Sequence, residues 1–409
     1  MKPFSSPLSP MKRCLVAVLL LAVLSDHSSA AEETPDILLG MTTALTGPTS
    51  ELGTAMRDGV VAGLERINRA GGINGRQLKL FVLDDGYEPY RAAANMRTLL
   101  EEKQVLAIIG NVGTPTAIAS VPIAVEQKTL FFAPFTGAGL LRRHPPERYV
   151  VNYRASYEQE IEAMVEALIE QGGLAPTDIA FFTQRDGYGD AGYVSGYRAL
   201  KRRGLKNDRQ ILHVRYERNT LAVENALADI LYYRHPPKAV IMVGAYAPCA
   251  KFIQLAKESG LKALFLNVSF VGSKPLQRKL GPYADNVIIT QVVPPLTGSR
   301  PPVADEFIAD LEKIRSKTDP NDVSLEGYMA ARILGKALQK APSSLTREAV
   351  IDSLESLGSF NLGPGIPLKL SRQRHQASDG VWPTRLTAQD VLPFSWTEIG
   401  PLLREVTSP

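Results

Sequence analysis

The sequence predicts an α/β protein made of two doubly wound lobes, each built on a parallel sheet. From residue 37 onward, short apolar runs alternate with amphipathic stretches of helical length. This β-α-β order is typical of parallel sheets with helices on both faces. The alternation restarts after residue 149, and at 409 residues the chain is too long for one ordinary core. Two such runs therefore indicate two lobes.

The first run begins directly after a polar N-terminal stretch, and its apolar segments are bounded by turn residues such as Gly71-Gly72. The pattern predicts strands at 37–41, 78–83, 105–109 and 130–133, with helices at 56–67, 91–102 and from 114 onward.

The second run repeats this order, and a helical tail follows it. We expect strands at 179–182, 211–214, 239–243 and 263–266, and helices at 157–171, 193–203, 221–231, 250–258, 303–314, 327–338 and 346–357. Beyond residue 359 the chain is rich in Gly and Pro, which allows short strands at most.

The N-terminus has the features of a secretory signal peptide. A basic pair at 12–13 precedes an apolar run at 14–24, and a small-residue Ser-Ser-Ala site ends at residue 30. As a helix the apolar run would span roughly 16 Å, whereas a bilayer core is about 30 Å thick. We therefore expect residues 1–30 to be removed on export. Translation could start at Met1 or at Met11.

Composition excludes several classes of protein. Hydrophobic residues make up 44% of the chain and charged residues 22%, and the formal net charge is +4. Without residues 1–30 the basic and acidic residues nearly balance, so we expect no nucleic-acid partner. Cys14 precedes the apolar run, which argues against a lipid anchor, and Cys249 is then the single cysteine of the mature chain. A disulfide and a cysteine zinc site are therefore not expected.

Two turns after strands of the first lobe carry candidate binding residues, because open α/β sheets bind ligands beyond the carboxyl ends of their strands. Thr114 is placed to cap a helix that starts at Pro115, where free backbone N–H groups suit a carboxylate. Thr136 adds a hydroxyl, and Gly137 and Gly139 permit close backbone approach. A plain capped helix and an ordinary turn are the alternatives.

The second lobe has two comparable turns with a tyrosine each. Tyr188 lies between two glycines at a helix start, and Tyr246 holds the same topological position one unit later. Either ring could cover a bound solute, or could simply pack in the core. Cys249 follows, and we expect a small buried core residue rather than a reactive thiol.

These turns, in this order, resemble those of the leucine/isoleucine/valine-binding protein family, the solute-binding subunits of bacterial ABC importers for branched-chain amino acids. The segments 43–48 and 67–75 and the pair Asp84-Asp85 extend the resemblance, which covers about residues 36–360. It implies the type I periplasmic binding protein fold, a Venus-flytrap clamp with three crossovers. Lobe one would be 32–152 plus 281–352, and lobe two 153–280 plus 353–409.

The resemblance also implies a function and a set of site residues. The protein would be a periplasmic monomer that binds a small solute, such as an amino acid or an organic acid or amide, and docks on ABC-importer permease subunits in the inner membrane. A ligand-sensing receptor using the same clamp is the alternative. The implied ligand-binding residues are Leu52, Val112, Gly113, Thr114, Phe135, Thr136, Gly137, Tyr188, Tyr246 and Ser269.

Ser269 departs from the family pattern, which has an acidic residue there to neutralise the ligand's ammonium group. No carboxylate occurs from Leu261 to Tyr283. Burying an unpaired ammonium would cost several kcal/mol. Either an acid arrives from elsewhere, or the ligand lacks a free ammonium; Phe135 and Phe270 could then supply apolar walls.

An enzyme is not expected. The mature chain has four histidines, His144, His213, His235 and His375, and none has a triad or metal-ligand spacing. Asp84-Asp85 belongs to a structural segment in the resembling family. We therefore expect no cofactor, no metal and no catalytic residue.

Overall fold

The structure is a computed structural model that describes residues 1, 35–298, 300–362 and 367–408. The chain divides into two compact units, 1–35 and 36–409, and everything below concerns the second. The predicted signal peptide lies outside the described residues.

The first sheet has five parallel strands in the order β2-β1-β3-β4-β5. These strands are β1 (Ile37–Thr43), β2 (Leu78–Asp84), β3 (Ala107–Ile109), β4 (Leu130–Phe132) and β5 (Val150–Val151). Helices cover both faces, as the alternating pattern predicts: Ile108 packs with α3 and α4, and its neighbour Ile109 belongs to the core on the opposite face. The helices of this lobe are α2 (Ser50–Arg69), α3 (Pro89–Arg97), α4 (Thr114–Glu126), α10 (Pro302–Lys313), α11 (Asp322–Lys340) and α12 (Arg347–Glu355).

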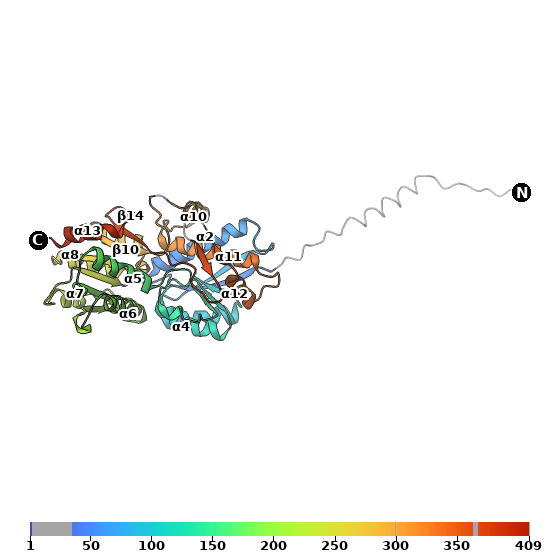
Figure 1. The fold of residues 1–409 in the computed structure, drawn as a ribbon. Coiled ribbons are helices and arrows are strands. Elements are labelled where there is room, and N and C mark those ends of the chain that lie inside the picture. The colour runs from blue at the N-terminus through green and yellow to red at the C-terminus, as the bar shows by residue number, and fades with distance from the viewer. Residues whose placement is uncertain (2–34, 299, 363–366, 409) are drawn as a thin grey trace. The chain divides into compact units, whose positions relative to one another are not determined.

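The second sheet has seven strands in the order β14-β13-β10-β9-β8-β6-β7. Its parallel part consists of β6 (Ile179–Gln184), β7 (His213–Tyr216), β8 (Ala239–Val243), β9 (Leu264–Asn267) and β10 (Val287–Gln291), and β13 (Trp382–Leu386) and β14 (Val391–Pro393) add an antiparallel edge. The surrounding helices are α5 (Tyr157–Glu166), α6 (Gly187–Arg202), α7 (Glu224–Leu231), α8 (Tyr246–Glu258), α9 (Ser273–Leu280) and α13 (Ile399–Thr407). Figure 1 shows the two sheets as separate groups of strands, each with its own helices.

The chain crosses between the sheets after β5, after β10, and between a small hairpin, β11 (Gly358–Phe360) with β12 (Leu368–Leu370), and β13. The predicted bounds differ here. Residues 281–352 were expected in lobe one, but β10 pairs with β9 and β13 and so lies in the second sheet. Residues from 353 were expected in lobe two, but His375 still bonds to the carbonyl of Val150 in β5 of the first sheet. The second and third crossovers therefore lie at about residues 292 and 377. The bounds differ because the partner strands, and not the order of the elements along the chain, decide to which lobe a strand belongs.

Four helices begin at least four residues earlier than the apolar pattern predicts, because mostly polar and small residues form their first turns. Helix α2 begins at Ser50 rather than at residue 56. Asp186 caps α6 by accepting from the backbone of Tyr188, so this helix begins at Gly187 rather than at residue 193. Helix α8 begins at Tyr246, and α11 at Asp322 after its Asn321 cap. Both candidate tyrosines consequently lie in first helical turns.

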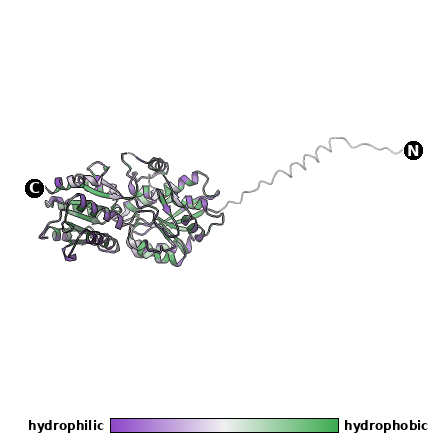
Figure 2. Cartoon of the chain, in the orientation of Figure 1, coloured by the Kyte–Doolittle hydropathy of each residue, from purple (hydrophilic) through white to green (hydrophobic). Residues whose placement is uncertain are grey.

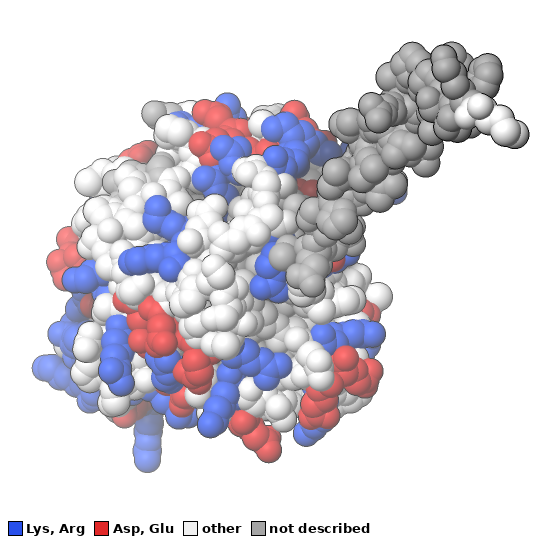
Figure 3. Space-filling view, turned by 90° about the vertical axis from the view of Figure 1, so that its right-hand side faces the viewer, with Lys and Arg blue, Asp and Glu red and all other residues white. Residues whose placement is uncertain are grey.

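Apolar residues line the strands and inner helix faces, and polar residues lie outside (Figure 2). Lys and Arg mix with Asp and Glu on the face in Figure 3, as the near-balanced charge predicts. Among the described helices, none is long and apolar enough to cross a membrane.

Candidate functional site

The carboxyl ends of β3 and β4 bring Thr114 and Thr136 face to face. Their Oγ1 atoms are 2.6 Å apart, and both side chains are fully buried. Val112 and Phe135 form an isolated parallel bridge that continues the pairing of the two strands past their ends. The shared hydrogen bond uses one of the two hydroxyl protons, so one O–H donor remains for a carboxylate. These residues, with Gly113 and Gly137, form what we call the first jaw.

Gly113, rather than the predicted Thr114, is the N-cap of α4. Its φ is +107°, and a Cβ at this position would lie 2.2 Å from the ring of Tyr87. Only glycine meets both conditions. Thr114 is therefore the first helical residue, and its hydroxyl faces Thr136 instead of capping the helix. Gly137 is equally confined, because a Cβ there would lie 2.6 Å from the backbone nitrogen of Tyr157.

The second jaw consists of Tyr188 and Tyr246, from the second lobe. Tyr188 is fully buried and donates its hydroxyl proton to the carbonyl of Gly244 at 3.4 Å. Burial raises the pKa of Tyr246 to about 12, and the charge of Glu51 on α2 adds to that rise. Tyr246 therefore lies near Glu51, at the start of α2 in the first lobe.

Ser269 meets a carboxylate that comes from a distant part of the sequence. Glu160, on α5, accepts from the backbone N–H of Ser269 at 2.8 Å and from its hydroxyl at 3.0 Å. It also accepts from Thr290 Oγ1 at 2.6 Å. Glu160 is fully buried, and burial raises its pKa, while the positive charge of Arg154 opposes the rise. An acid from a distant part of the chain therefore lies directly beside Ser269.

Arg154 lies in the crossover after β5 and forms a buried ion pair with Glu326 of α11. Its Nε and Nη2 atoms donate to the two Glu326 carboxylate oxygens, each at 3.0 Å, and both side chains are 1% exposed. Burial raises the pKa of Glu326 to about 7, although Arg154 opposes that rise. The guanidinium carbon also lies 4.3 Å from the ring centroid of Phe135. The pair thus joins a crossover to both the first jaw and the first lobe.

Aromatic rings from both lobes pack against one another between the jaws. Phe270 follows Ser269, and its ring centroid is 4.6 Å from that of Tyr188 and 5.3 Å from that of Phe135. Tyr87 lies 6.0 Å from Phe270, and Tyr157 lies 5.3 Å from Tyr188. Since Phe135 and Tyr87 belong to the first lobe and Phe270 to the second, the two lobes are in direct contact. The predicted apolar walls Phe135 and Phe270 do meet.

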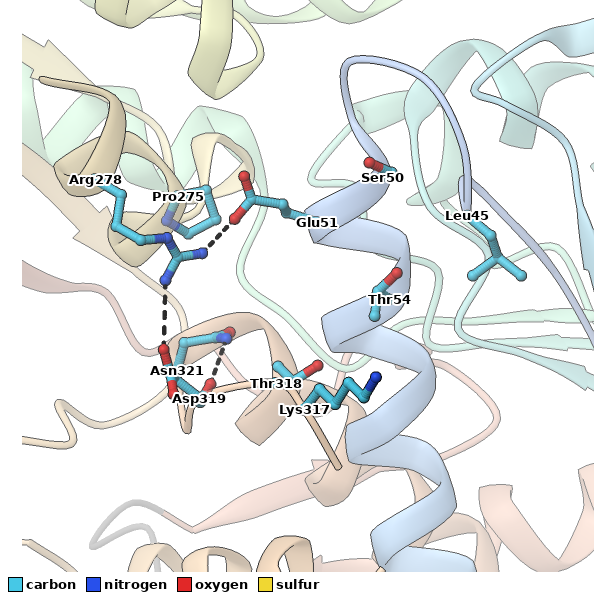
Figure 4. A pocket seen from close by; sticks show the side chains of 10 residues that line it. All are labelled: Leu45, Ser50, Glu51, Thr54, Pro275, Arg278, Lys317, Thr318, Asp319 and Asn321. Atoms are coloured by element: carbon cyan, nitrogen blue, oxygen red, sulfur yellow. Dashed lines mark hydrogen bonds and ion pairs between the residues drawn. The ribbon is translucent and has the colours of Figure 1, made fainter. Parts of the chain in front are cut away.

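The lobes are also linked at the rim of this contact. A cavity of about 360 Å³ opens there, and across it Glu51 of α2 and Arg278 of α9 point toward each other and form an ion pair (Figure 4). Leu52 is fully buried next to Gly272, where an added Cβ would lie 2.6 Å from its side chain. Leu52 therefore reaches the second lobe.

Groups outside the site have structural partners. Cys249 is fully buried and burial raises its pKa, so the expectation of a core residue is confirmed. Asp84 accepts from the backbone of Leu45, and Asp85 from Thr42, which supports the structural assignment. In the part of the chain that the structure describes, no cluster of His, Cys, Asp and Glu is arranged to hold a metal ion.

Three residues of the site were missed by the sequence analysis: Glu160, Arg154 and Glu326. Glu160 lies within a helix whose other acidic residues are on the surface, so its periodic position gives no distinct signal. A tertiary contact defines each of them, since Glu160 and Ser269 are 109 residues apart, and Arg154 and Glu326 are 172 residues apart. The one sequence feature that could have pointed to this group is Arg154, a charged residue shortly after the apolar strand Val150–Val151.

Two doubly wound lobes, with buried hydroxyls in one and two tyrosines and a buried acid in the other, define a two-lobed solute-binding protein. Sequence comparison agrees, since a family model described as periplasmic binding protein matches residues 36–390. The chain belongs to the periplasmic binding protein family, whose members bind solutes in the periplasm.

The matches to known proteins extend over most of the chain. A solved structure of a possible leucine/isoleucine/valine-binding protein from Rhodopirellula baltica is 44% identical, with a TM-score of 0.87, over 91% of this chain and 99% of that one. The Leu/Ile/Val-binding protein homolog 7 of Brucella abortus is 25% identical, over 90% of this chain and 93% of that protein. The leucine-, isoleucine-, valine-, threonine-, and alanine-binding protein of Pseudomonas aeruginosa is 22% identical, over 80% and 83%.

Proposed function

We propose that this protein captures an α-amino acid between its lobes and delivers it to the permease subunits of an ABC importer. The ligand carboxylate would lie at Thr114 and Thr136, with Val112, Gly113 and Gly137 shaping the same jaw. Its ammonium group would lie at Glu160 beside Ser269. Tyr188 and Tyr246 would enclose the solute from the opposite lobe, and Leu52 would cover it from the first lobe.

The contact between Glu160 and Ser269 carries this proposal. A carboxylate oxygen pair offers about four acceptor positions, and the three donors of Ser269 and Thr290 leave room for one more. A buried acid with no directly bonded cation is costly, and an ammonium group would compensate it. The names of the relatives, which include binding of leucine and alanine, agree with an amino-acid ligand.

The remaining steps rest on the family. We propose export by a signal peptide at residues 1–30, a monomer in the periplasm, no catalytic activity and no cofactor. If the protein docks on a permease, its function is transport. A ligand-sensing receptor is the alternative function. A gene neighbourhood with permease and ATPase genes would support transport, whereas a histidine-kinase gene would support sensing.

Matched ligands test the proposed chemistry directly. Purified mature protein is screened by thermal shift and then by calorimetry with alanine, valine and leucine, and with the same acids lacking the amino group. We expect a rise in Tm for at least one amino acid, because tight binding stabilises the native state, and none for its deaminated partner. A carboxylate without an amino group that binds as tightly as the amino acid would refute the ammonium site.

Replacing Thr114 by valine should weaken binding without unfolding the protein. The change keeps the shape but removes a hydroxyl from a charged ligand group, which typically costs about 1.5–3 kcal/mol, or at least about tenfold in Kd. Calorimetry with the best amino acid of the screen measures it. Thr129→Val, a buried threonine away from the jaws, is the matched control. Equal affinities of Thr114→Val and the wild type would remove Thr114 from the site.

A further inference from the structure

A second cavity lies beside the crossovers, away from the jaws. Its volume is about 230 Å³, and two segments line it, 141–146 and 373–376. The first segment follows the first-jaw loop in the sequence. The second runs beside the crossover strand through the bridge between Asn152 and Gln376. The cavity thus contacts the part of the chain that connects the two lobes.

The lining of this cavity is basic. Its charged or titratable residues are Arg142, Arg143, His144, Arg374 and His375, and the others that line it are neutral. Three acidic groups lie next to the lining: Glu355 bonds to His375, Asp379 pairs with Arg374 at 2.6 Å, and Glu147 is 3.9 Å from Arg143. None of these carboxylates lines the cavity itself, so its wall has a positive potential.

Arg142 has no carboxylate partner among the described residues. Its Nε donates to the side-chain oxygen of Gln376 at 2.7 Å, and its other donors bond to the backbone carbonyls of Thr136, Ala138 and Arg154. Burial, and then the charge of Arg154, lower the pKa of Arg142 to about 10. The groups bonded to it directly are therefore all neutral, although the charges of Glu160 and Glu326 also act on it, and a nearby anion would stabilise its positive charge.

Two further guanidinium groups have capacity for a ligand. The Arg143 side chain is 68% exposed, and Glu147 is 3.9 Å away, beyond hydrogen-bonding distance. The Nε of Arg374 is buried without a hydrogen-bond partner in the described structure. Planar guanidinium groups bind oxyanions through paired N–H donors, better than a single point charge does.

We propose that this cavity at the crossovers is a binding site for a small multivalent oxyanion of the phosphate or sulfate type. Arg143 and Arg374 contact the anion, and Arg142, which has no directly bonded carboxylate among the described residues, contributes its positive charge. Because Arg142 also bonds to the carbonyl of Thr136, the bound anion reaches the first jaw through one side chain. Occupancy of this site therefore strengthens solute binding, and solute strengthens anion binding by the same factor.

The test uses the solute-free mature protein, so that its outcome does not depend on the proposed ligand. Sodium phosphate and sodium sulfate are titrated against sodium chloride at equal ionic strength, with Tm and calorimetry as readouts. We expect saturable binding of one oxyanion per protein, and at least a tenfold loss of affinity in Arg143→Gln/Arg374→Gln. The control Arg185→Gln/Arg209→Gln changes the net charge equally at exposed residues elsewhere and should bind as the wild type does.

A stabilisation that chloride reproduces, or that persists in Arg143→Gln/Arg374→Gln, would overturn the site. The best amino acid of the screen is then titrated with and without saturating phosphate. A rise of threefold or more in affinity supports the link through Arg142 to Thr136. An unchanged solute affinity together with specific phosphate binding would overturn that link and keep the anion site.

Discussion

Replacing Glu160 by glutamine is expected to abolish high-affinity amino-acid binding while the protein remains folded. Breaking a buried charge pair by removing one partner typically costs about 3–5 kcal/mol, which corresponds to at least about a hundredfold in Kd. Calorimetry with alanine, valine and leucine measures this loss. The unliganded protein should be as stable as the wild type or more so, because burial already disfavours the charged form of Glu160 and raises its pKa.

Two comparisons separate the charge of Glu160 from its hydrogen bonds. Glu162 lies on the same helix and pairs with Arg202 and Arg203 at the surface, so Glu162→Gln should leave binding unchanged. Ser269→Ala removes one donor to Glu160 but keeps its charge, and we expect a smaller loss than in Glu160→Gln. If Glu160→Gln binds every amino acid within threefold of the wild type, the ammonium site is not at Glu160.

The sequence was informative where the chemistry is local. Strand ends, glycines and hydroxyls that follow one another along the chain placed Thr114, Thr136, Tyr188 and Tyr246 in turns that the fold brings to the lobe interface. The cap of α4 was misplaced by one residue, because the choice between Gly113 and Thr114 depends on the ring of Tyr87 behind the turn. No pattern within the turn encodes that contact.

The acid at Ser269 could not be predicted, because it depends on how two distant elements meet. Position 269 follows β9, whereas Glu160 is in the second turn of α5 and reaches it across the lobe. A family pattern records which residue stands at a position, but charge can be supplied to the same point in space from another helix. The missing carboxylate at 269 was therefore a correct observation, and ligand chemistry could not be deduced from it alone.

The lobe bounds failed for a related reason. The helices at 303–314 and 327–338 were expected to pack on lobe one, and α10 and α11 do contact α2. The strand that precedes them, β10, has the composition of any buried strand, and its partner strands decide its sheet. Apolar periodicity predicts that a strand exists and leaves its neighbours open.

Replacing Arg154 by methionine should destabilise the fold strongly, whereas removing both members of the ion pair should not. The single change leaves Glu326 buried without its cation, which typically costs about 3–5 kcal/mol of unfolding free energy. In Arg154→Met/Glu326→Leu two apolar side chains of similar size fill the same space, and the free energy of unfolding should return to within about 1 kcal/mol of the wild type. Urea denaturation measures both variants.

The loss should also depend on pH in the single variant. Burial already raises the pKa of Glu326 to about 7 with Arg154 present, and without that cation it rises further. A carboxyl whose pKa is higher in the folded than in the unfolded state favours folding at low pH, and this advantage is lost as pH rises toward the folded pKa. Arg154→Met should therefore be less destabilised at pH 5 than at pH 8. The double variant should lack the part of this pH dependence that comes from Glu326.

The exposed pair Arg185 and Glu217 is the control, with side chains 58% and 62% exposed. Arg185→Met should cost no more than about 1 kcal/mol, because surface ion pairs contribute little. If Arg154→Met were equally mild at both pH values, Glu326 would have to be neutral or solvated in the folded protein, and the ion pair would not be what joins the crossover to α11. A strong, pH-dependent loss that the second substitution reverses would instead show that the charge of Glu326, rather than the volume of Arg154, sets the stability of this crossover.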